Sequence, residues 1–123
     1  MSKRILITGA GSGFGLGAAV ALAKRGHRVI ATVLNDQQAQ ALSEQSLPID
    51  IVKLDITKAE DRDQVEGFEV DVFFANAALG QTGPVSLIPI DRLRRVFEVN
   101  VFATVAITQQ IALSMRKRRS GRI

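Results

Sequence analysis

The sequence predicts an α/β fold in which helices cover both faces of a parallel sheet. Short runs rich in β-branched residues alternate with longer segments of helical character, and most connections between them are short. A glycine-rich stretch, TGAGSGFG at residues 8–15, joins the first apolar run to the first helical segment. A strand that leads through such a turn into a helix is typical of dinucleotide-binding sheets. We therefore expect one Rossmann-type, doubly wound domain over residues 1–123.

Four strands are expected along the chain. They occupy residues 4–8, 28–33, 49–54 and 70–75. The last run is apolar except at Asp71, as expected of a parallel strand that is covered on both faces. Residues 121–123 look like the entry to a fifth strand, so we expect the sheet to be truncated before that strand.

Helices are expected between and after these strands. They occupy residues 14–25, 36–44, 57–67 and 91–119. Gly26 is expected to end the first helix in the left-handed conformation, and Thr57 and Asp91 are the expected caps of the third and fourth helices. Gly17 should allow the first helix to approach the sheet closely. The fourth helix is apolar on nearly all sides, which predicts that more than one surface covers it.

Composition excludes several classes of protein. There are no cysteines and a single histidine, so neither a disulfide framework nor a metal site is expected. We find no continuous apolar run of about 18 residues and therefore expect no membrane span. The first strand begins almost at once, which leaves no room for a signal peptide, and we expect a cytoplasmic protein.

The net charge of +4 comes from a cluster near the end of the sequence. Five of the 16 basic residues lie within the last eight positions, and the rest of the chain is close to neutral. Basic side chains at this point complement the dipole of the preceding helix. We therefore expect no nucleic-acid partner.

The glycine-rich turn indicates function most directly. Glycines allow a tight turn and a close approach of the backbone to phosphates, and the helix that follows offers unpaired N–H groups to an anion. An ordinary strand-to-helix loop is the alternative. Ser12 can bond a phosphate or cap the helix, and these two roles are compatible.

Several motifs in the expected order resemble those of the short-chain dehydrogenase/reductase family. The pattern TGxxxGxG at residues 8–15 has the family's glycine spacing, and LDIT at 54–57 resembles its segment after the third strand. The family's Asn-Asn-Ala-Gly element is matched by NAA at 76–78, with departures at Ala75 and Ala78. GPV at 83–85 and VFEVN at 96–100 resemble the approach to the family's long helix and its first part. The resemblance extends from residue 3 to residue 123.

This resemblance implies a dinucleotide cofactor, NAD or NADP, and hydride transfer between its nicotinamide and an alcohol or ketone. It places Asp55 where the family bonds the adenine amino group, and Asn100 where the family has its catalytic asparagine. The cofactor-binding residues that it implies are Gly9, Gly11, Ser12, Gly13, Phe14, Gly15, Asp55, Ile56, Asn76 and Ala77.

Other roles are open for the polar residues among these. Asp55 can cap the helix that follows, Asn76 can stabilise the adjacent loop, and Asn100 can make a plain hydrogen bond to a neighbouring loop. The kind of dinucleotide is open too. Val33 and Leu34, at the end of the second strand, supply neither the acidic residue that favours NAD nor the arginine that favours NADP.

The family's catalytic serine and its Tyr-x-x-x-Lys pair belong to segments beyond residue 123, and this sequence contains no tyrosine. Because the phenol exchanges a proton with the substrate, we expect the 123-residue chain by itself to be inactive. We interpret it as the dinucleotide-binding half of an oxidoreductase. The alternatives are a non-catalytic dinucleotide-binding module or sensor, and a fragment whose long helix serves only self-association. The resemblance also implies a homo-oligomer in which the 91–119 helix pairs with its equivalent.

Overall fold

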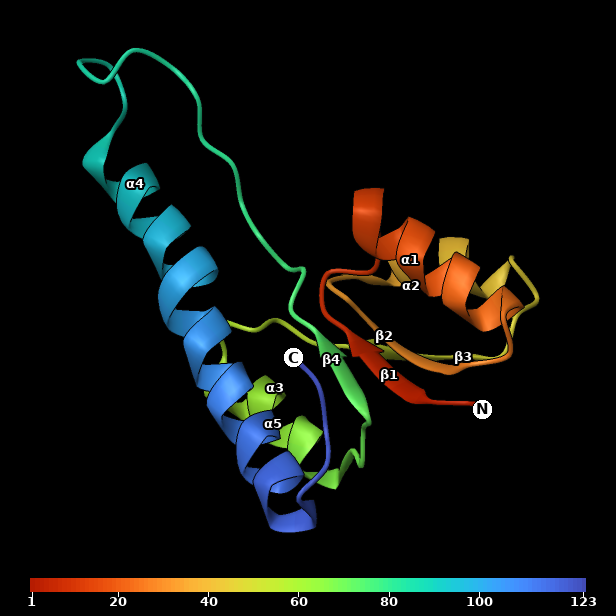
Figure 1. Ribbon diagram of the computed structural model, residues 1–123. Helices are drawn as coiled ribbons and strands as arrows, with labels where there is room; N and C mark the ends of the chain where they lie inside the picture. The colour runs from red at the N-terminus through yellow and green to blue at the C-terminus, as the bar shows by residue number, and fades with distance from the viewer.

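The computed structural model describes all residues, 1–123, as alternating strands and helices (Figure 1). The strands are β1 (Arg4–Ile7), β2 (Arg28–Val33), β3 (Ile49–Lys53) and β4 (Val72–Phe74). The helices are α1 (Gly13–Lys24), α2 (Asp36–Ser43), α3 (Ala59–Asp63), α4 (Ile90–Phe97) and α5 (Thr104–Arg118), with a 3-10 turn η1 (Gln64–Gly67) and a π-helical turn η2 (Glu98–Ala103). Each expected strand and helix is present, with α3 and η1 together forming the third expected helix and α4, η2 and α5 the fourth. The ends shift by no more than two residues.

All four strands are parallel, and their order in the sheet is β3-β2-β1-β4. Ile5 of β1 is paired with Val29 of β2 on one side and with Val72 of β4 on the other. The chain therefore adds β2 and β3 to one side of β1 and then returns to add β4 to the other side. This reversal creates a switch point at the carboxyl end of β1, and it confirms the expected Rossmann-type fold.

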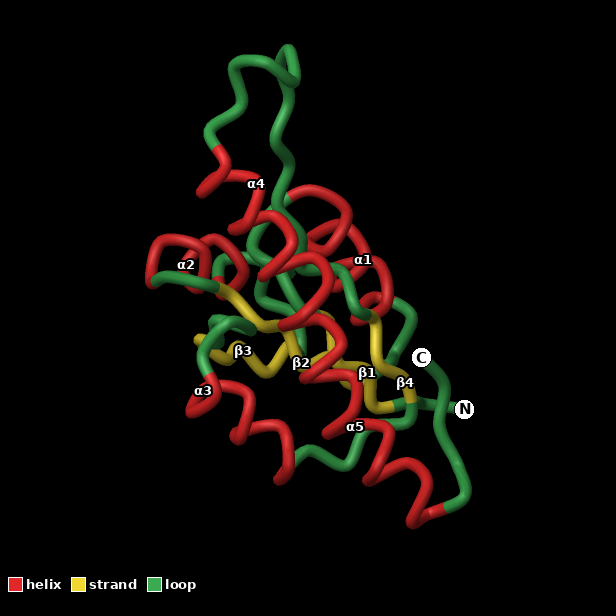
Figure 2. The backbone as a smooth tube through the Cα atoms, turned by 90° about the vertical axis from the view of Figure 1, so that its left-hand side faces the viewer, coloured by secondary structure: helices red, strands yellow, loops and turns green.

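Helices cover both faces of the sheet, with α1 and α2 on one face and α3 and α5 on the other (Figures 1 and 2). Ile5 and Ile7 of β1 pack in one apolar cluster with Leu42 of α2. Leu6, between them, packs in the opposite cluster with Ile107 of α5. Successive side chains of a strand point to opposite faces, so β1 is buried on both sides.

Two glycine expectations have different outcomes. Gly26 follows the end of α1 with φ of +85°, as expected. The expectation for Gly17 is wrong, because nothing lies within 4 Å of the place where its Cβ would be. A Cβ on Gly15 would instead collide with the Gly9 carbonyl oxygen and the Asn76 side chain. Gly15 is thus the residue that lets α1 begin against the glycine-rich turn.

Two helix starts also differ from the expected caps. α3 follows Lys58, because the Thr57 side chain is bonded to Asp55 instead of capping the helix. α4 follows Pro89, and Asp91 lies inside the first turn. Neither helix has a side-chain hydrogen bond at its cap.

The long helix is continuous over Ile90–Arg118 and contains the π-helical turn η2 near its middle. A π-helical turn interrupts the regular i to i−4 bonding. Here the Thr104 hydroxyl donates to the Val99 carbonyl oxygen at 2.9 Å. The face against the sheet is formed by buried residues at intervals of four, namely Val99, Ala103, Ile107, Ile111 and Met115.

This helix bears on the expectation that no segment spans a membrane. It is long and apolar enough to cross a membrane, with a mean hydropathy of 1.4 in its most apolar 18-residue window, 22% of which is buried. The expectation counted only unbroken apolar runs, whereas isolated polar residues leave the mean hydropathy high. Length and composition alone are weak evidence for a span, because the core helix of a globular domain passes the same test.

The segment after α5 runs alongside β4. Arg122 forms a parallel bridge with Val72, in which the Phe73 N–H donates to the Arg122 carbonyl oxygen at 2.9 Å. The Arg122 N–H in turn donates to the Asp71 carbonyl oxygen at 3.0 Å. These contacts are those of an incoming strand beside β4, as expected from the sequence.

Candidate functional site

A cavity of about 230 Å³ lies at the carboxyl ends of the strands. Its lining comes from the glycine-rich turn, from the ends of β2 and β3 and the segments after them, from the segment after β4, and from the long helix. The lining residues are Gly9, Gly11, Ser12, Thr32, Val33, Leu34, Gln38, Leu54, Asp55, Ile56, Thr57, Asn76, Ala77, Ala78, Leu79, Arg95 and Val99. Open α/β sheets bind ligands at this edge, where the strand order reverses.

The glycine-rich turn packs closely against Ala77 and Gln38, which excludes side chains at Gly9 and Gly11. Gly9 has φ of +65°, and a Cβ there would lie 2.8 Å from the Ala77 Cα atom. The turn is also tied to β2, because the Ala10 N–H donates to the Thr32 carbonyl oxygen at 2.8 Å. The turn therefore presents backbone, with no side chain at Gly9, to the cavity.

Ser12 occupies the N-cap position of α1, yet its hydroxyl makes no capping hydrogen bond. The first N–H groups of a helix have no partner within the helix, and the helix dipole makes this end attractive to anions. Ser12 lines the cavity, so its unbonded hydroxyl lies at the cavity wall, directly before the start of α1.

Asn76 fixes the turn from the other side. Its Nδ2 atom donates to the carbonyl oxygens of Thr8 and Gly9, both at 3.1 Å. The Thr8 hydroxyl oxygen accepts from the main-chain N–H groups of Asn76 and Ala77, also at 3.1 Å. The main-chain N–H and the side-chain amide of Asn76 therefore both donate within the protein. This is the loop-stabilising role that the sequence left open.

Asp55 is the acidic residue of the cavity. Its Oδ1 atom accepts from the Thr57 N–H at 2.9 Å and from the Thr57 hydroxyl at 2.7 Å. Burial tends to raise the pKa of Asp55, but these hydrogen bonds and the nearby Arg95 and Lys58 hold the pKa below its ordinary value. The side chain is therefore an ionised acceptor at neutral pH, and it bonds Thr57 instead of capping α3.

Asn100 lies on the π-helical turn and outside the cavity lining. Its side chain accepts from the Leu79 N–H and donates to the Leu79 carbonyl oxygen, both at 2.7 Å. This is the hydrogen bond to a neighbouring loop that the sequence also allowed. Leu79 does line the cavity, so Asn100 positions part of the wall without reaching the cavity itself.

The structure brings together seven of the ten expected cofactor-binding residues and leaves three outside the lining. Gly13, Phe14 and Gly15 do not line the cavity. Phe14 is 91% exposed, because α1 has already begun at Gly13 and turns this side chain away from the sheet. Gly15 acts indirectly, through its close contact with Gly9.

Sequence reasoning missed Gln38 and Arg95 as lining residues. Gln38 lies one turn into α2, and Arg95 lies on α4, so only the packing of these helices brings them to the cavity. Thr57 was also missed, although an Asp-x-Thr sequence at a strand end is a recognisable local hydrogen-bonding motif.

Residues 3–123 match the short chain dehydrogenase family. The chain belongs to this family. Human 17-beta-hydroxysteroid dehydrogenase type 1 is 34% identical over a match that covers 97% of this chain and 40% of the human enzyme. This chain spans about half the length of the curated relatives it matches.

Two solved structures likewise align with nearly all of this chain, which covers about half of each of them. A short-chain dehydrogenase from Streptomyces avermitilis aligns with a TM-score of 0.86 and 31% identity, over 98% of this chain and 47% of that one. A short-chain dehydrogenase from Sphingobium yanoikuyae, solved in complex with NADPH, aligns with a TM-score of 0.84 and 23% identity, over 97% of this chain and 51% of that one. The chain thus has the Rossmann-type NAD(P)-binding fold of this oxidoreductase family.

Proposed function

We propose that the cavity binds a nicotinamide dinucleotide, and that the whole protein is an NAD(P)-dependent oxidoreductase acting on an alcohol or ketone. The observation that carries this proposal is the juxtaposition of the Cβ-free turn at Gly9 with Ser12, the N-cap of α1, and the Asp55 carboxylate around one cavity. Membership of the short-chain dehydrogenase family supports the reaction class.

The residues present fit such a cofactor. The turn at Gly9 presents main chain without a side chain, which lets a phosphate approach it closely, and Ser12 at the N-terminus of α1 supplies donors for it. The Asp55 carboxylate can accept a hydrogen bond from the adenine amino group. The bound nicotinamide would give or take the hydride, while this chain binds and orients the cofactor. Asn100 contributes by holding the Leu79 main chain at the cavity wall.

A second candidate is dinucleotide binding without catalysis by residues 1–123 alone. The chain has no tyrosine and thus no phenol to exchange a proton with the substrate. We expect the 123-residue chain to bind the cofactor and to show no turnover with alcohols or ketones. Cofactor-dependent turnover by this chain would contradict the division between binding and acid–base residues.

We also propose that the long helix pairs with its equivalent in a homo-oligomer. Apolar side chains on it are exposed even though its opposite face packs on the sheet. They are Leu93, Phe97, Val101, Phe102, Val105 and Leu113. Two-fold contacts between identical surfaces are the commonest arrangement in oligomers.

The binding proposal is tested by changing one charge at the start of α1. Ser12→Asp and Ser12→Asn both supply a good helix cap, so either variant should keep α1 folded. Only the aspartate places a negative charge where a pyrophosphate should bind. We expect calorimetry with NADH and NADPH to show about tenfold to hundredfold weaker binding for Ser12→Asp than for Ser12→Asn. Equal affinities of the two variants would rule out this wall as the phosphate site.

A further inference from the structure

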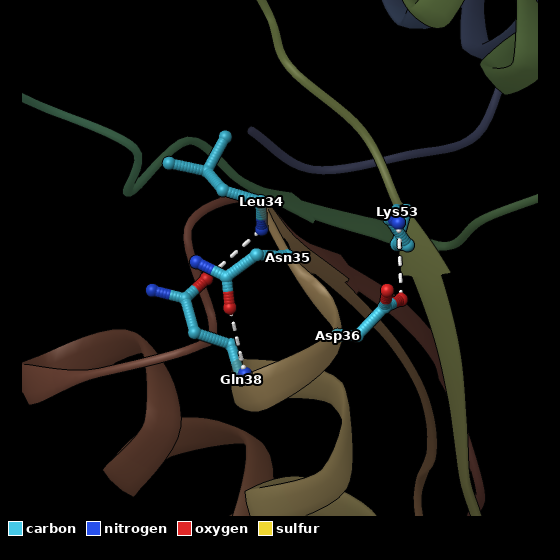
Figure 3. Close-up of polar contacts among 5 residues, drawn as sticks. All are labelled: Leu34, Asn35, Asp36, Gln38 and Lys53. Carbon is cyan, nitrogen blue, oxygen red and sulfur yellow. Dashed lines mark hydrogen bonds and ion pairs between the residues drawn. The ribbon is translucent and has the colours of Figure 1, made fainter.

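The side chain of Gln38 lies between the end of β2 and the glycine-rich turn (Figure 3). Its Oε1 atom accepts a hydrogen bond from the Leu34 N–H at 2.9 Å. The main-chain N–H of Gln38 donates to the Oδ1 atom of Asn35, the cap of α2, also at 2.9 Å. On the other side, a Cβ on Gly11 would overlap the Gln38 amide group. The amide is thus held by hydrogen bonding at Leu34 and by packing at Gly11.

The second amide atom, Nε2, has no hydrogen-bond partner in the protein, and Gln38 lines the cavity. Because Oε1 already accepts from the Leu34 N–H, the side chain offers a ligand its Nε2 donor. The amide carries no charge. A hydroxyl group can accept from this donor without any charged partner being present.

No cation accompanies Gln38 at this end of the cavity. Lys53, at the end of β3, forms an ion pair with Asp36 at 3.0 Å. Figure 3 shows this pair turned away from Leu34 and Gln38. Arg95 is the one basic residue of the lining, and it comes from α4, where its charge acts on Asp55. Phosphate groups in proteins are held by arginine or lysine side chains and by helix N-termini.

We propose that Gln38 makes the site selective for NAD(H) over NADP(H). This inference rests on the proposed function. Gln38 fills the space between Leu34 and Gly11 that a 2′-phosphate on the adenosine ribose would require, and it offers Nε2 to an unphosphorylated 2′-hydroxyl. A 2′-phosphate would have to displace the amide from Leu34 and would find no arginine or lysine side chain there. Selectivity for the cofactor is thus set by a neutral residue of α2.

The test is calorimetric titration of the protein with NADH and NADPH, and with ADP-ribose and its 2′-phosphate, which report the adenosine end alone. We expect NADH to bind at least about tenfold more tightly than NADPH. Gln38→Glu should raise the NADH to NADPH affinity ratio by about tenfold, and Gln38→Lys should lower it by about tenfold, because their charges repel and attract the 2′-phosphate.

Matched controls are Gln40→Glu and Gln40→Lys, which place the same charges on the same helix at an exposed residue bonded to Glu44 and outside the cavity. These variants should leave the ratio unchanged. Two results would overturn the inference and leave the proposed function standing. One is NADPH binding as tight as NADH in the unmodified protein, and the other is an NADH to NADPH affinity ratio that neither Gln38 variant changes. Failure of every dinucleotide to bind would overturn the proposed function itself, and the inference with it.

Discussion

Thr8 and Asn76 are joined by two hydrogen bonds at the boundary between β1 and β4. The Asn76 N–H donates to the Thr8 hydroxyl oxygen, and the Asn76 Nδ2 atom donates to the Thr8 carbonyl oxygen, both at 3.1 Å. The same Nδ2 atom also reaches the Gly9 carbonyl oxygen. The glycine-rich turn and the segment after β4, which are far apart in sequence, are therefore held as one unit at the cavity.

Replacing Asn76 should loosen this unit. Asn76→Ala leaves the Thr8 and Gly9 carbonyl oxygens without their donor, and we expect the free energy of unfolding to fall by about 1–3 kcal/mol. Dinucleotide affinity should fall with it. Chemical denaturation and calorimetry measure the two effects. Gln81→Ala is the control, since this exposed amide bonds only the neighbouring Thr82 carbonyl oxygen. Equal stability of the two variants would contradict the bracing role.

Two glycines of the same segment should respond oppositely to alanine. Gly9→Ala forces a side chain onto Ala77 at a positive φ, so we expect lower stability and weaker dinucleotide binding. Gly17→Ala adds a methyl group in open space inside α1, and it should stabilise the protein by about 0.4–1 kcal/mol. Thermal and chemical denaturation test both variants. A destabilised Gly17→Ala variant would restore the rejected expectation that this glycine serves close packing.

Asp55 predicts an acid-sensitive contribution to stability. Its folded-state pKa lies below the ordinary value of 3.8, so the ionised form stabilises the fold. This contribution is complete above about pH 5 and is lost as the pH falls through 3.8 to the lower folded-state pKa.

Thr57→Val should remove the hydroxyl hydrogen bond and raise the pKa of Asp55. The stability difference between the native protein and this variant should then be largest at neutral pH and should shrink in acid. An NMR titration of the Asp55 carboxyl group, with denaturation at several pH values, measures both. Thr82→Val, which lies in an exposed loop, serves as the control. An unchanged Asp55 titration in Thr57→Val would refute the assigned cause.

The exposed apolar face of the long helix predicts self-association. Val105→Glu and Leu113→Glu alter side chains that are 51% and 56% exposed, so the fold should persist while the assembled species becomes smaller. Light scattering measures the mass, and cofactor binding should be largely retained. Leu87→Glu, at a 75% exposed loop residue, is the control. A strictly monomeric native protein would contradict this prediction, and co-sedimentation of the native protein with lipid vesicles would assign the apolar face to a membrane instead.

Local pattern was sufficient for much of the fold. The β-branched runs, the positive-φ position at Gly26 and the glycine-rich turn each depend on residues close together in the chain, and each was predicted. The π-helical turn around Asn100 was not, because it depends on how the helix packs rather than on its own propensities. The role of Gly17 was mistaken for that of Gly15 for a similar reason, since sequence does not show which glycine meets a neighbouring backbone.

The sequence by itself determined the succession of strands and helices along the chain and the glycine spacing. It also determined most of the residues that would meet at the carboxyl edge of the sheet. It left Asp55, Asn76 and Asn100 with two roles each. Only the tertiary structure showed which partners their polar atoms bond, and only it brought Gln38 and Arg95 to the cavity. The physical reason is that strand and turn signals are local, whereas the partner of a buried polar group comes from another part of the chain.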